Sequence, residues 1–63
     1  MKNLRLHLSA EDTASHYRMR AAETARLAEA ASLSDDVHMY LRMTDCWIRL
    51  AEQAELRQEL EAA

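Results

Sequence analysis

The stretch that decides the fold is residues 31–41, ASLSDDVHMYL, which separates two long segments of helix-forming sequence. The chain has no glycine and no proline, so the residues that usually end a helix are missing. Ser32 and Ser34 are favourable N-cap residues, and Asp35 and Asp36 suit the first turn of a helix, whose N-terminus attracts negative charge. Ser32 and Asp35 also have the spacing of a capping box, with aspartate in place of glutamate. These signals predict that a second helix starts here.

On either side of this break we expect helices at residues 10–31 and 35–59, joined by a turn at residues 32–34. A connection this short makes the two helices antiparallel, as a helical hairpin. Ala, Glu, Leu and Arg dominate the composition, and all are strong helix formers. The sequence therefore predicts an all-α fold in one domain, residues 9–63. The alternative is a single continuous helix through Leu33.

Residues 1–8 have a different pattern, in which apolar and polar residues alternate: Leu4, Leu6 and Leu8 with Asn3, Arg5 and His7. A period of two is typical of a half-buried β-strand. A single strand needs a partner strand from a second copy or from another protein. The sequence thus predicts a short extended or β-like N-terminal arm, and the alternative is an arm whose leucines lie against a helix.

The apolar residues of the two predicted helices fall on defined faces when they are projected at about 100° per residue. One face of the first helix is mostly alanine: Ala14, Tyr17, Ala21, Thr24, Ala25, Ala28 and Ala31. The second helix has a main stripe: Val37, Tyr40, Leu41, Thr44, Trp47, Ile48, Ala51 and Ala54. A second line lies beside that stripe: Met39, Met43, Cys46 and Leu50.

The stripe and the second line together cover about 200° of the circumference of the second helix, and one partner helix cannot cover that much. We therefore expect self-association, most simply as a homodimer of hairpins in a four-helix bundle. The predicted oligomer or partner interface consists of Tyr17, Ala21, Ala28, Met39, Tyr40, Leu41, Met43, Thr44, Trp47, Ile48, Leu50 and Ala51.

The size and charge of the chain limit the class of protein. A chain of 63 residues forms a marginal core, which disulfides, metals or oligomerisation usually support. Cys46 is the only cysteine, so it has no internal disulfide partner, and a lone cysteine is typical of a reducing compartment. No apolar run is long enough for a signal peptide or a membrane span, so a cytoplasmic protein is expected. The net charge of −3 argues against a surface built mainly for nucleic acid.

The sequence predicts neither a catalytic site nor a cofactor or metal site. His38 and Cys46 are eight residues apart, more than two helical turns, so they cannot bind one metal ion from one helix. Asp35 and His38 have the carboxylate-x-x-His spacing of di-iron bundles, but neither apolar line contains the glutamates that such sites need. There is no glycine-rich phosphate loop and no pair of inward carboxylates. We therefore expect a protein that is not an enzyme.

Parts of this sequence are similar to two protein families. The stretches HYRMRAAETARLAEAA and YLRMTDCWIRLAEQAE resemble short, uncharacterised proteobacterial helical-hairpin proteins, with matching positions at His16, Tyr17, Arg20, Ala21, Trp47, Leu50, Ala51 and Glu52. That resemblance covers about two thirds of the chain and implies no activity. The order strand, helix, helix also resembles the ribbon–helix–helix DNA-binding dimers. This second resemblance implies that Asn3, Arg5 and His7 contact DNA, but the first helix is too long for that family and its interhelical glycine is absent.

The leading hypothesis is a small homo-oligomeric helical hairpin that acts through protein–protein contact, as an adaptor or small regulatory subunit. Its partner is a second copy or a larger protein. The alternative is a dimeric transcriptional regulator that binds DNA through the N-terminal strand, and a third possibility is a small acidic inhibitor of a larger protein.

Overall fold

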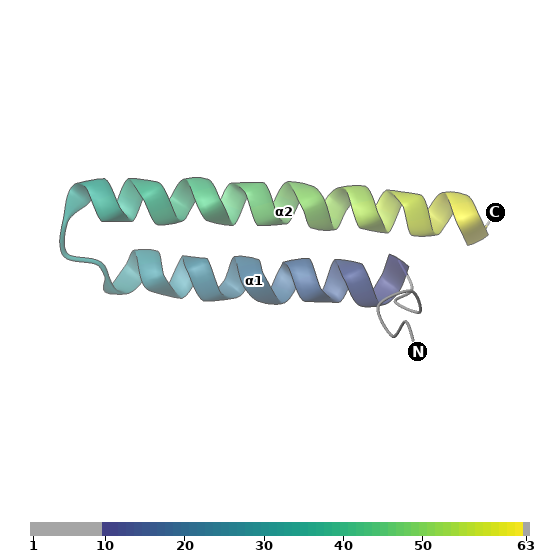
Figure 1. Cartoon of the computed structure of the whole chain (residues 1–63), viewed down its shortest axis with the longest axis horizontal. Helices are drawn as coiled ribbons and strands as arrows, with labels where there is room; N and C mark the ends of the chain where they lie inside the picture. The colour runs from purple at the N-terminus through teal and green to yellow at the C-terminus, as the bar shows by residue number, and fades with distance from the viewer. Residues whose placement is uncertain (1–9, 63) are drawn as a thin grey trace, which may run out of the picture.

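The protein is a two-helix antiparallel hairpin, as the sequence predicts (Figure 1). In the computed structural model residues 10–62 are described, with side chains from residue 13 onward. Helix α1 spans Ala10–Ala30 and helix α2 spans Ser34–Ala62, and the two pack against each other along their length. Helix α1 ends one residue before the predicted position, while α2 starts one residue earlier and continues three residues further than predicted. The predicted arm, residues 1–8, lies outside the described residues.

The turn between the helices consists of only three residues, 31–33. The N–H of Ala31 donates to the carbonyl of Leu27 at 3.0 Å, which adds one last helical bond to α1. The N–H of Val37 donates to the carbonyl of Leu33, also at 3.0 Å, and this is the first backbone bond of α2. Leu33 therefore occupies the N-cap position of α2.

The predicted serine cap of α2 is wrong. In the described part of the chain neither Ser32 nor Ser34 donates or accepts a side-chain hydrogen bond. The short turn places a leucine at the N-cap position, so the residue at that position has no side-chain oxygen to accept a hydrogen bond from the first-turn N–H groups. Asp35 and Asp36 do lie in the first turn, where their charge complements the helix dipole.

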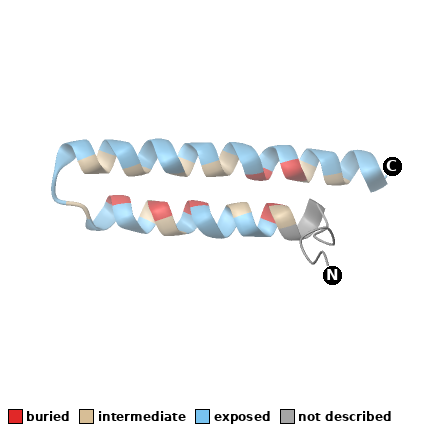
Figure 2. Cartoon of the chain, in the orientation of Figure 1, coloured by how far each residue is buried: buried red, intermediate tan, exposed pale blue. Residues whose placement is uncertain are grey.

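The core of the hairpin is made of small side chains. The buried residues are Ala14, Ala21, Thr24, Ala28, Ala51 and Ala54 (Figure 2). Small residues let two helices approach closely, but each buries little apolar area. Among the described residues no large side chain is fully buried. The two helices therefore bury only a small apolar core between them.

The two predicted helix faces agree with the structure except at one position. All seven residues predicted for the inner face of α1 are buried or half-buried. Along the main stripe of α2, Ala51 and Ala54 are buried and most of the others are half-buried, but Leu41 is 51% exposed. Leu41 lies about 80° around α2 from Ala51, beyond the reach of α1. Neither α1 nor α2 has an apolar stretch of the length that a bilayer crossing requires.

Three side-chain contacts between the helices fix their register. The aromatic rings of Tyr17 and Trp47 stack with their centres 5.9 Å apart and an interplanar angle of 29°. The hydroxyls of Thr24 and Thr44 are 2.6 Å apart. Arg18 binds Glu55 through two hydrogen bonds, of 3.0 Å from Nε and 2.8 Å from Nη2. Aromatic, hydroxyl and ionic contacts thus hold one alignment of α1 on α2.

Candidate interaction surface

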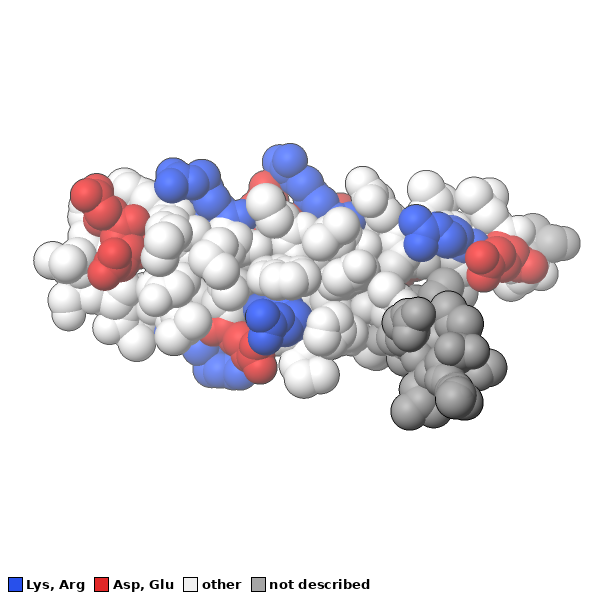
Figure 3. Space-filling model, in the orientation of Figure 1, with Lys and Arg blue, Asp and Glu red and all other residues white. Residues whose placement is uncertain are grey.

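The second apolar line of α2 forms an exposed face of the hairpin. Met39 and Met43 are each 40% exposed, Leu50 is 38% exposed, and Cys46 is exposed as well. Together with Arg42 and Trp47 these residues line an open groove of about 450 Å³. Figure 3 shows this face of the molecule: charged side chains lie along its upper edge, at both ends and in a cluster in its lower part, and uncharged side chains occupy most of its middle. The sequence predicts this line as part of an interface, and in the single chain α1 does not cover it.

Trp47 lies between this face and the core of the hairpin. Its ring stacks on Tyr17, and the guanidinium carbon of Arg20 lies over it at 5.3 Å from the ring centre. A cation over an indole face is attracted by the ring quadrupole. The ring centres of Tyr17 and His16 are also 5.9 Å apart, and these two rings are tilted relative to each other. Two residues of α1 thus hold the indole in place while part of it borders the groove.

Helix α1 adds charged side chains and an exposed leucine to this side of the hairpin. Arg20, which lies over Trp47, also donates a hydrogen bond of 3.3 Å to Glu23. Leu27 follows Arg20 by seven residues, on the same face of α1, and is 47% exposed in a shallow hollow with Glu23, Arg26 and Ala30. Most of the apolar part of the surface therefore belongs to α2.

The ion pair between Arg18 and Glu55 shifts the pKa values of both partners. Hydrogen bonds from the Arg18 guanidinium, helped by its positive charge, hold the pKa of the Glu55 carboxyl below its ordinary value. The same hydrogen bonds and the charge of Glu55 raise the pKa of Arg18. Both side chains are nearly half exposed, so solvent screens the pair. This pair links the two helices and lies apart from the apolar groove.

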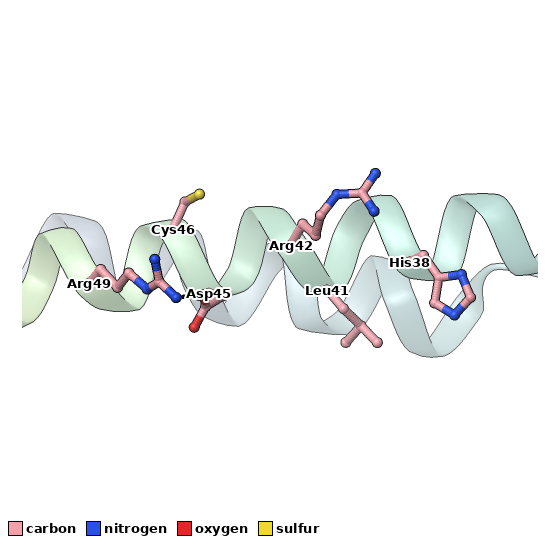
Figure 4. A pocket seen from close by; sticks show the side chains of 6 residues that line it. All are labelled: His38, Leu41, Arg42, Asp45, Cys46 and Arg49. Atoms are coloured by element: carbon pink, nitrogen blue, oxygen red, sulfur yellow. Dashed lines mark ion pairs between the residues drawn. The ribbon is translucent and has the colours of Figure 1, made fainter.

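A second hollow lies on the outer surface of α2 (Figure 4). Its six lining residues all come from α2: His38, Leu41, Arg42, Asp45, Cys46 and Arg49. Arg49 and Asp45 form an ion pair of 2.8 Å, whereas His38 and Cys46 are separated along the helix (Figure 4). Across residues 10–62 no group of three His, Cys, Asp or Glu side chains is placed so that it could hold a metal ion. The structure does not bring polar groups from two elements together in this hollow.

The predicted interface residues divide into three groups by burial. Ala21, Ala28 and Ala51 are buried between α1 and α2, so they serve the packing of the hairpin itself. The following are half-buried and border that core: Tyr17, Tyr40, Thr44, Trp47 and Ile48. The exposed members are Met39, Leu41, Met43 and Leu50. The alternative DNA-contacting residues Asn3, Arg5 and His7 lie outside the described part of the chain.

Sequence reasoning missed the role of three arginine contacts. The stacking of Arg20 on Trp47 and the pairing of Arg18 with Glu55 both join residues far apart in the chain. Neither contact follows from helical periodicity, because each depends on the register between the helices. The i,i+4 spacing of Asp45 and Arg49, in contrast, is a signal that the sequence does contain.

The fold and this surface define the chain as a helical hairpin with one exposed apolar face. Comparison with protein-family models, with curated proteins and with solved structures found no match to this chain.

Proposed function

We propose that this protein is a non-enzymatic helical hairpin that dimerises into a four-helix bundle and acts through protein–protein contact, as an adaptor or small regulatory subunit. The observation that carries this proposal is the exposed line of Met39, Met43, Cys46 and Leu50 along one side of α2. Contiguous apolar side chains on a soluble surface are typical of an interface. Methionine is also common at binding surfaces because its unbranched side chain adapts to a partner.

The small core of the hairpin supports the same proposal. Among residues 13–62, the side chains that α1 and α2 bury between them are five alanines and one threonine. Burial of apolar area contributes roughly 25 cal/mol per Å², so the larger side chains on the exposed face have more to contribute than these alanines. A second copy that covers this face would supply the burial that a short chain otherwise lacks.

The test is the mass of the protein in solution, measured over a range of concentrations by sedimentation or light scattering. We expect the mass of two chains, with dissociation on dilution. Met43→Glu places a charge in the middle of the exposed line and should give the mass of one chain at concentrations where the unmodified protein is a dimer.

The matched control is Leu56→Glu, which makes the same chemical change at an exposed leucine of the same helix. Leu56 is 56% exposed and lies about 140° around α2 from both Ala51 and Met43, on the outer surface of the helix. This variant should remain a dimer. A mass of one chain for the unmodified protein at high concentration would remove the proposal.

A second candidate function is DNA binding by a ribbon–helix–helix-like dimer. The observation that favours it is the alternation in residues 1–8, which would place Asn3, Arg5 and His7 on one polar face. Deletion of residues 1–8 should then abolish dimer and DNA affinity together, and Arg5→Ala should weaken DNA binding in a salt-dependent way. If the deleted chain still dimerises and the full chain has no DNA affinity at low salt, this candidate is removed.

A further inference from the structure

We propose that the dimer pairs α2 with α2 of a second copy, antiparallel, about a two-fold axis that passes between Cys46 and Trp47. Asp36 then lies opposite the partner's Arg57, and Met43 lies opposite the partner's Leu50. This inference rests on the self-association proposed above and specifies which helices meet, in which direction and in which register.

The choice of helix follows from what each helix contributes to the exposed face. On this side α2 presents mainly the apolar Met39, Met43 and Leu50, with Arg42 as the charged residue of its groove. Helix α1 presents Leu27 between two charged groups, Arg20 and its hydrogen-bond partner Glu23. If α2 lay on α1 of the second copy, the methionines would cover these charged groups, and their desolvation opposes binding. Pairing α2 with α2 instead places apolar surface on apolar surface.

The direction follows from the charges at the two ends of the apolar line. Asp36 precedes the line and Arg57 follows it, and at 100° per residue both lie within about 40° of Met43 around α2. A parallel pair of α2 helices would bring Asp36 to Asp36 and Arg57 to Arg57. An antiparallel pair brings opposite charges together at both ends.

The register follows from the same two charges. Within residues 13–62 neither Asp36 nor Arg57 takes part in an ion pair of the single chain. An axis between residues 46 and 47 places each of them opposite the other in the partner, and two-fold symmetry makes two such pairs. The same axis aligns Met43 with the partner's Leu50, so the apolar line stays in contact with itself. One register thus satisfies the charges and the apolar side chains together.

Cys46 reports on this arrangement because it lies next to the proposed axis. In an antiparallel pair the two Cys46 side chains fall on the same side of the seam. With helix axes 8–10 Å apart, their Cα atoms are roughly 6–7 Å apart, close to the range that a disulfide spans. Cys46 is exposed in the single chain and borders the groove. If α2 lay on α1 of the second copy, the two thiols would be on opposite edges of the bundle, beyond this range.

The first experiment is mild oxidation of the full chain at a concentration where its mass shows a dimer. We expect rapid formation of a disulfide-linked dimer. The matched control, Cys46→Ala with Leu56→Cys, moves the single thiol to the outer surface of α2 and is compared at a concentration where it is also dimeric. Its disulfide should form at least tenfold more slowly. A non-covalent dimer whose Cys46 reacts no faster than this control overturns the proposed arrangement, but self-association stands. A mass of one chain removes both proposals.

The second experiment tests the register by charge reversal. Asp36→Arg and Arg57→Asp should each raise the dissociation constant of the dimer about threefold to tenfold, since each replaces two attractions by two repulsions at sites that solvent partly screens. The two substitutions together should restore the original constant to within about twofold. The effects should shrink at high salt because exposed charges are screened. If the double variant is as weak as the two single variants combined, the register is wrong.

Discussion

At the scale of single residues, the contact between Thr24 and Thr44 is the polar centre of the hairpin interface. Thr44 can donate to the carbonyl of Tyr40 at 2.9 Å, Thr24 can donate to the carbonyl of Ala21 at 3.1 Å, and the two hydroxyls are 2.6 Å apart. Two hydroxyl hydrogens cannot serve all three bonds at once. Each hydroxyl therefore has a backbone acceptor ready if the other hydroxyl is removed.

This arrangement predicts that the costs of substituting the two threonines are nearly additive. Thr24→Val and Thr44→Val should each lower the free energy of unfolding by about 0.5–1.5 kcal/mol, because valine keeps the shape and removes one hydrogen bond. The double variant should cost about the sum of the two single changes, since the two hydroxyl hydrogens make two bonds and each substitution removes one of them. Urea unfolding of the four proteins at one concentration measures this cycle. A double variant that costs no more than either single variant would show that the remaining hydroxyl does not bond to its backbone carbonyl when its partner is removed.

Substitution of Trp47 best distinguishes the stability of the single hairpin from the stability of the proposed dimer. Its ring is half-buried against Tyr17 and Arg20 in the single chain. Full burial of tryptophan makes truncation to alanine cost about 3–5 kcal/mol. We expect Trp47→Ala to cost about half of that under dilute conditions where the protein is monomeric, and the full amount where it is dimeric. A cost below about 1 kcal/mol in both conditions would mean that the ring stabilises neither the single hairpin nor the dimer.

At the scale of the helices, periodicity predicts which residues face inward, but it does not predict the ends. Ala14, Ala21 and Ala28 are seven residues apart, and this spacing alone places them on one face of α1. The N-cap of α2 depends instead on which residue of the turn has the carbonyl that accepts the first backbone hydrogen bond of the helix. Residue types alone do not determine that position. The contact of Arg18 with Glu55 likewise requires the register, and the register depends on a three-residue turn.

The position of Leu33 predicts a stabilising substitution. Leu33 occupies the N-cap of α2 and is 66% exposed, so its side chain packs against little and offers no oxygen to the first turn. Leu33→Ser should raise the free energy of unfolding by about 0.5–2 kcal/mol, because serine can accept a hydrogen bond from the first-turn N–H groups. Leu33→Ala is the control without an acceptor and should have little effect. If both variants behave alike in thermal unfolding, Leu33 does not act as the cap.

The ion pair between the helices predicts a pH dependence with a definite sign. The pKa of Glu55 is lowered by its hydrogen bonds with Arg18, so the folded state binds this proton less readily than the unfolded state. The contribution of Glu55 is therefore present above its ordinary pKa of 4.5 and is lost as the pH falls below that value, through the lowered pKa of the folded state. The melting temperature of Glu55→Gln should depend less on pH in this acidic window than that of the unmodified protein. An equal dependence in both proteins would show that the pair does not stabilise the hairpin.

At the scale of the whole molecule, the sequence indicates how much apolar surface α2 carries, and the structure shows which part α1 leaves uncovered. Alanine dominates the inner face of α1, so a close helix pair with a small core follows from composition. The sequence does not show that the charged pair of Arg20 and Glu23 occupies the α1 side of the exposed face, because that depends on how the helices are aligned. This alignment is what makes α2, and not α1, the surface available to a second copy.

Dimerisation through this surface predicts that thermal stability depends on protein concentration. When the folded state associates and the unfolded chain does not, a higher concentration favours the folded state, so the melting temperature should rise steadily over a hundredfold range of concentration. Met43→Glu should melt at a lower temperature that does not change with concentration, whereas Leu56→Glu should keep the rise. Circular dichroism at a helix-sensitive wavelength, in cells of different path length, follows all three proteins. A cooperative transition of the unmodified chain at one fixed temperature throughout this range would mean that α1 and α2 are sufficient without a second copy.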